Sequence, residues 1–145
     1  MNIKLRYVLF FAVGAAAILG CSSKKTDQHH STSQDQDEWP EMESFHMVMA
    51  EAYHPYKDSA NLEPVKSLAE NLAKESEKWA ESTLPAAVNN GEVKGKLEKL
   101  KRDCRALADQ VKAGASNKQL GKSLTLLHES FHDIMEGWQK TKDPR

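Results

Sequence analysis

The stretch LGKSLTLLHESFHDIMEGW, residues 120–138, decides the fold of this chain of 145 residues. Its large apolar side chains recur three or four positions apart, which is the spacing that places them on one face of an α-helix. A long amphipathic helix is therefore expected here. Its core-facing stripe consists of Leu120, Leu124, Leu127, Phe131, Ile134 and Trp138.

Three segments upstream show the same helical spacing, and no sustained strand-like alternation follows residue 39. The first runs from about residue 40 to 54. There Pro55 is expected to end or kink the helix and open a loop, because proline lacks a backbone N–H. The second is expected over about residues 64–79 and the third over about residues 97–111.

Four amphipathic helices with short connections predict an all-α fold, an up-down-up-down antiparallel four-helix bundle. This bundle domain is expected to occupy residues 39–145. Cys104 falls on the apolar stripe of the third segment, so we expect a buried core residue rather than a nucleophile.

The residues before the domain have a different character. Residues 1–20 combine two positive charges with a short apolar run, which is typical of a signal peptide rather than a membrane span. The end of this segment, Ile-Leu-Gly followed by Cys21, resembles the lipobox of bacterial lipoproteins. The resemblance implies a lipid on Cys21 and a place in the bacterial cell envelope, tethered to a membrane and facing the periplasm or exterior. Residues 21–38 are almost entirely polar and are expected to form a flexible tether, with His29 and His30 as polar filler.

Charge and motifs exclude several functions. Without the leader's Lys4 and Arg6, eighteen basic residues face 21 acidic ones, so the mature chain has no basic excess for nucleic acid. The chain contains no nucleophile elbow, phosphate loop or His-Glu-x-x-His motif. We therefore expect a protein that is not an enzyme.

The phrase Glu-Ser-Phe-His-x-[Val/Ile]-Met occurs twice, at residues 43–49 and 129–135. A helix turns by about 100° per residue, so each position of the phrase can be placed on its helix. The phenylalanine lies in the apolar stripe, the methionine and histidine lie on one flank, and the glutamate points to water. The positions are Phe45, Met49, His46 and Glu43 in the first copy and Phe131, Met135, His132 and Glu129 in the second.

These positions predict a metal site between the first and fourth helices. His128 lies one turn before His132 on the same flank, a spacing that lets two imidazoles share one ion. If the two helices are antiparallel and level at their ends, His46 lies opposite about residue 133 and meets His132, with His54 one further turn along. Zinc and copper both accept imidazole nitrogen, and the softer Met49 and Met135 would favour copper. The expected ligands are His46, His54, His128 and His132.

Haem is the alternative cofactor. The order of the helices, with methionine choices on the first and a histidine late in the fourth, resembles soluble four-helix b-type cytochromes of the bacterial periplasm. That resemblance implies haem b and electron transfer, with Met49 or Met42 and His132 as axial ligands, or His46 and His132. A di-iron carboxylate site is not expected, because the glutamates of the repeated phrase point outward.

The sequence thus favours a metal-binding protein for buffering, delivery or resistance, with a metal-donor or metal-acceptor protein as a possible partner. A structural or partner-binding lipoprotein without a cofactor is the competing interpretation. It explains the same methionines as core and the same histidines as solvated surface.

Overall fold

The computed structural model describes residues 38–142, and this part of the chain is all-helical. The prediction of an all-α fold is confirmed. The leader, Cys21 and the tether as far as residue 37 lie outside the described residues. The helices are α1 (Pro40–Ser59), α2 (Glu63–Glu81), α3 (Gly91–Lys112) and α4 (Asn117–Lys142), with a short 3-10 helix, η1 (Ala86–Val88), between α2 and α3.

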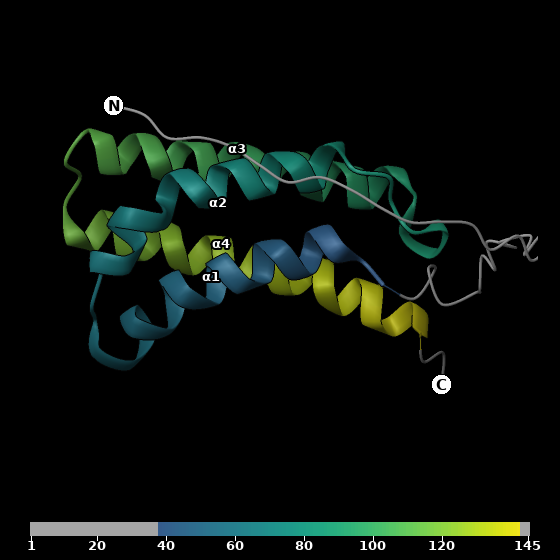
Figure 1. The fold of residues 1–145 in the computed structure, drawn as a ribbon, viewed down its shortest axis with the longest axis horizontal. Coiled ribbons are helices and arrows are strands. Elements are labelled where there is room, and N and C mark those ends of the chain that lie inside the picture. Colours follow the sequence, from purple (N-terminus) through teal and green to yellow (C-terminus); the bar gives the residue numbers. More distant parts are fainter. Residues whose placement is uncertain (1–37, 143–145) are drawn as a thin grey trace, which may run out of the picture. The chain divides into compact units, whose positions relative to one another are not determined.

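Each α-helix packs against its neighbours in sequence, and α1 also packs against α4. Figure 1 shows α2 beside α3 and α1 beside α4. Along the seam between α1 and α4, later residues of α1 meet earlier residues of α4. The contacts are Trp39 with Trp138, Phe45 with Phe131, and Tyr53 with His128.

The core consists of the apolar stripes that the helical spacing predicts. Phe45 and Met49 have no exposed surface, and Phe131 is 1% exposed. Cys104 is also fully buried, as expected of a core residue. The three tryptophans form one cluster, in which the ring centroids of Trp39 and Trp79 lie 5.2 Å apart and those of Trp39 and Trp138 lie 5.7 Å apart.

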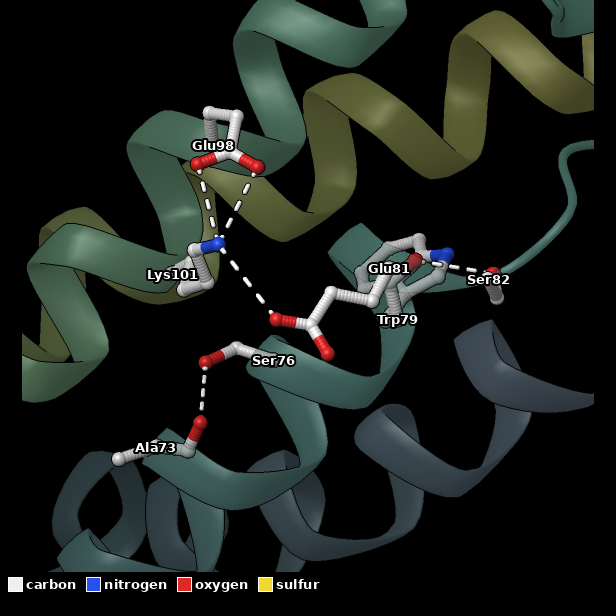
Figure 2. Close-up of polar contacts among 7 residues, drawn as sticks. All are labelled: Ala73, Ser76, Trp79, Glu81, Ser82, Glu98 and Lys101. Carbon is white, nitrogen blue, oxygen red and sulfur yellow. Dashed lines mark hydrogen bonds and ion pairs between the residues drawn. The ribbon is translucent and has the colours of Figure 1, made fainter.

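Polar contacts of α2 and α3 accompany this core, some at the surface and one inside it. Figure 2 shows Lys101 of α3 between two carboxylates, Glu98 on its own helix at 3.2 Å and Glu81 on α2 at 4.0 Å. In the same view, the hydroxyl of Ser76 donates a hydrogen bond to the carbonyl of Ala73. The buried serine is therefore satisfied within its own helix.

The expected end of the first helix is wrong. Instead of ending at His54, α1 continues through Pro55 to Ser59. Pro55 removes the hydrogen bond that its N–H would donate to the carbonyl of Glu51, and the helix accepts the loss of this one bond and continues for one more turn. Ala60 follows the helix as a left-handed cap: its N–H donates to the carbonyl of Tyr56, and the turn brings the N–H of Asn61 to the carbonyl of Pro55.

The other helices begin earlier than their apolar residues indicate. Asn90 caps α3, because its side chain accepts a hydrogen bond from the N–H of Val93. Ahead of α4, the Ser116 N–H donates to the side-chain oxygen of Gln119, and the Gln119 N–H donates to the Ser116 hydroxyl. This capping box fixes where the helix starts. None of the helices among residues 38–142 has the length and apolar character needed to cross a membrane.

Candidate metal site at the seam of α1 and α4

The two histidines of α4 form the centre of the candidate site. His128 and His132 lie one turn apart, directly beside the buried positions Leu127 and Phe131, so their half-buried rings stand at the edge of the core. The Nε2 atoms of the two rings are 3.1 Å apart. In the metal-free protein this contact is a hydrogen bond, in which one ring carries its proton on Nε2 and the other accepts through its Nε2 lone pair.

The separation of these two nitrogens also fits a shared metal ion. Imidazole nitrogen binds zinc at about 2.0 to 2.1 Å, so two such nitrogens at an angle of about 95° to 110° lie about 3.0 to 3.4 Å apart. The observed 3.1 Å falls within this range. A metal ion would need both Nε2 lone pairs, so binding requires the donor ring to move its proton to Nδ1.

The surroundings of His128 keep its ring neutral. Its ring stacks on Tyr53 of α1, with centroids 3.7 Å apart and planes 12° from parallel. Burial is the main cause that lowers the pKa of His128 to about 4, and nearby positive charges act in the same direction. A neutral imidazole is the form that binds metal, so at neutral pH few protons compete for this nitrogen. The neighbours that act electrostatically on His128 are His132, Lys57, His54 and His46.

His46 lies near this pair but does not join it. Its ring stacks on Phe131, with centroids 5.0 Å apart, two residues from the level at which the sequence places it. In the described part of the chain no hydrogen bond or ring contact joins His46 to His132. Its Nδ1 instead lies 4.0 Å from a carboxylate oxygen of Glu43 on the preceding turn.

The remaining predicted ligands lie at different depths. His54 is exposed on α1, although it is close enough to His128 to act on its pKa. Met49 is fully buried in the core, and Met135 is half-buried against it. Met42 lines a cavity of about 470 Å³ at the start of α1, beside Trp39 and Trp138.

The structure therefore assembles two imidazoles and places the others around them. Within residues 38–142, no three His, Cys, Asp or Glu side chains are grouped so that they could hold a metal ion together. A third ligand would have to come from a side chain that moves, such as the His46 ring, or from water. Two imidazole donors and an open position suit zinc or copper rather than calcium or magnesium, which prefer oxygen.

Two aromatic partners of the site were not predicted. The helical spacing predicts Phe131 as a core residue but does not predict that its ring stacks on His46. Tyr53 is absent from the predicted site, yet it covers the ring of His128. A signal was present in the sequence, because Tyr53 follows His46 by seven residues and so lies on the same flank of α1, about 20° away.

The comparisons with known proteins gave no relative. No protein-family model, curated protein or solved structure matches the chain.

Proposed function

We propose that this protein binds one zinc or copper ion at the seam of α1 and α4, with His128 and His132 as its first two ligands. The observation that carries the proposal is the 3.1 Å separation of the two Nε2 atoms. His46 supplies the third ligand when its ring leaves Phe131, and His54, a methionine or water completes the set. The protein acts by holding the ion, for buffering, delivery or resistance, and not by catalysis.

The proposal includes the setting of the site. The four helices form an up-down-up-down antiparallel bundle, which the opposed contacts along α1 and α4 support. A lipid on Cys21 holds this bundle at the bacterial envelope through the polar tether, and a metal-donor or metal-acceptor protein exchanges the ion. The anchor is tested by metabolic labelling with a radioactive fatty acid, which the wild-type chain incorporates and a Cys21→Ala variant does not.

Elemental analysis of residues 22–145, produced without a histidine tag, tests the metal site. We expect about one zinc or copper ion per chain, and none in a His128→Ala/His132→Ala variant. Glu136→Ala/Lys140→Ala is the matched control, because it removes two exposed side chains four residues apart on the same helix. The control should keep the ion.

A second measurement separates loss of the site from loss of the fold. A ligand present at about 100 times its Kd stabilises the folded state by about 2.7 kcal/mol. Zinc should therefore raise the Tm of the wild type and the control, while the double histidine variant keeps its helical circular dichroism and shows no rise. A metal-free wild type whose Tm does not respond to zinc or copper would refute the proposal. An absorption band typical of haem would favour the b-type cytochrome instead.

A further inference from the structure

The glutamates of the repeated Glu-Ser-Phe-His phrase have no role in the core. Glu43 and Glu129 are both exposed, whereas the phenylalanine two residues later is buried in each copy. Each glutamate lies one turn before a histidine, a spacing that puts the two side chains on neighbouring positions of the helix surface. The repeat therefore pairs a carboxylate with an imidazole on each side of the seam.

The first pair already shows which ring nitrogen faces the carboxylate. The Nδ1 atom of His46 lies 4.0 Å from Oε2 of Glu43, which is too long for a hydrogen bond but within reach of a rotation of the exposed glutamate. A carboxylate near Nδ1 stabilises the tautomer that carries its proton there. That tautomer leaves the Nε2 lone pair free.

The second pair has the same spacing in the sequence, and in the structure Glu129 lies at the edge of a cavity that it shares with Lys99 and Asp103 of α3. His132 directs Nε2 toward Nε2 of His128, so Nδ1 is the ring nitrogen that remains for another partner. Glu129 occupies the position relative to His132 that Glu43 occupies relative to His46. A rotation of the exposed Glu129 side chain toward Nδ1 of His132 would favour the same tautomer there, and this is the tautomer that binding through Nε2 requires.

We propose that Glu43 and Glu129 are positioning residues, each accepting a hydrogen bond from Nδ1–H of the histidine three residues later so that its Nε2 is presented to the ion. The inference rests on the proposed metal function. It gives the repeated phrase one physical meaning: the phenylalanine anchors the helix in the core, the histidine binds, and the glutamate orients the histidine. Metal-binding histidines are commonly held by a carboxylate in this way, and loss of the carboxylate weakens binding about 10-fold to 100-fold.

The test compares Glu43→Gln/Glu129→Gln with Glu41→Gln/Asp133→Asn in the chain of residues 22–145, because the Asp133 carboxylate is directed to Lys96 of α3 and not to His132. Both variants remove one negative charge from α1 and one from α4, so they change the general electrostatic attraction for zinc equally. We expect the Kd for zinc, measured by competition with a chelator, to rise at least about 10-fold in the first variant and less than about 3-fold in the control.

Nitrogen-15 chemical shifts of the imidazoles in the metal-free protein supply a readout that a merely structural role would not move. The wild type should carry the Nδ1–H tautomer at His46, and Glu43→Gln/Glu129→Gln should shift His46 toward the Nε2–H tautomer. Equal zinc affinities in the two variants, with unchanged tautomers, would overturn the inference and leave the metal site standing. A wild type that binds neither zinc nor copper would overturn both.

Discussion

A methyl group at Gly121 should loosen the seam between α1 and α4. A Cβ built on this glycine would lie 2.6 Å from the hydroxyl oxygen of Tyr56 and 2.8 Å from its Cζ. Ordinary van der Waals contacts of a Cβ begin near 3.4 Å. The half-buried Tyr56 side chain of α1 must therefore move away from Gly121 by about 0.8 Å or no longer pack against α4. We expect overpacking to cost about 1 to 3 kcal/mol, against about 1 kcal/mol gained by replacing a mid-helix glycine with alanine.

Urea unfolding followed by circular dichroism measures the balance. Gly121→Ala alone should lower the free energy of unfolding by about 1 kcal/mol, within a range of about 0 to 2. In a Tyr56→Ala background the clash is absent, so the same change should raise that free energy by about 1 kcal/mol. The sign of the effect therefore depends on the tyrosine.

Gly137→Ala is the control, because no atom lies within 4 Å of a Cβ placed there on the same helix. It should stabilise the protein by about 1 kcal/mol in both backgrounds. If Gly121→Ala is stabilising in the presence of Tyr56 as well, or if both glycines behave alike, the close approach of Tyr56 to α4 is refuted.

Three further predictions concern titration and reactivity. The pKa of His128 is about 4 in the folded state and near 6.5 in the unfolded state. Between these pH values the unfolded chain binds more protons than the folded chain. The metal-free protein therefore loses stability as the pH falls from 6.5 to 4. Since the ring is partly exposed, we expect a loss of about 1 to 2 kcal/mol in urea unfolding, absent in His128→Asn. The hydrogen bond from Arg105, followed by the ion pair with Lys112, lowers the pKa of Glu70 to about 2. The stability that Glu70 contributes is complete above pH 4.5 and disappears toward pH 2, so Glu70→Gln should flatten the acid limb of the stability curve. Burial raises the pKa of the Cys104 thiol to about 12, so a thiol reagent at pH 8 should modify it on the order of a thousandfold more slowly than after denaturation in guanidinium.

Helical periodicity predicts well which side chains are buried, but it does not predict how the histidine rings are oriented. The angle of about 100° per residue placed Phe45 and Phe131 in the core and Glu43 and Glu129 in water, as the structure confirms. It fixes only the direction of the Cα–Cβ bond. The turn of the His46 ring toward Phe131 depends on a side chain from another helix, which no pattern within α1 contains.

The sequence pattern does not predict the ends of the helices, because these depend on contacts made only in the folded chain. Pro55 predicts a helix end, but α1 accepts the loss of one hydrogen bond and continues for one more turn to Ser59. The 3-10 helix η1 (Ala86–Val88) was not predicted, because three residues between a proline and two asparagines are too short to show a period. Helix existence was thus predictable, whereas helix ends required the capping contacts of the folded chain.

The tryptophan cluster determines which part of the protein is monitored by intrinsic fluorescence. All three indoles of the chain lie in a single group of edge-on contacts where α1 begins and α4 approaches its end. Excitation energy passes readily between rings this close, so the three behave as one emitter. Intrinsic fluorescence therefore follows the opening of this one end, and a probe placed near Tyr53 or Gly121 is needed to see whether the other end opens first.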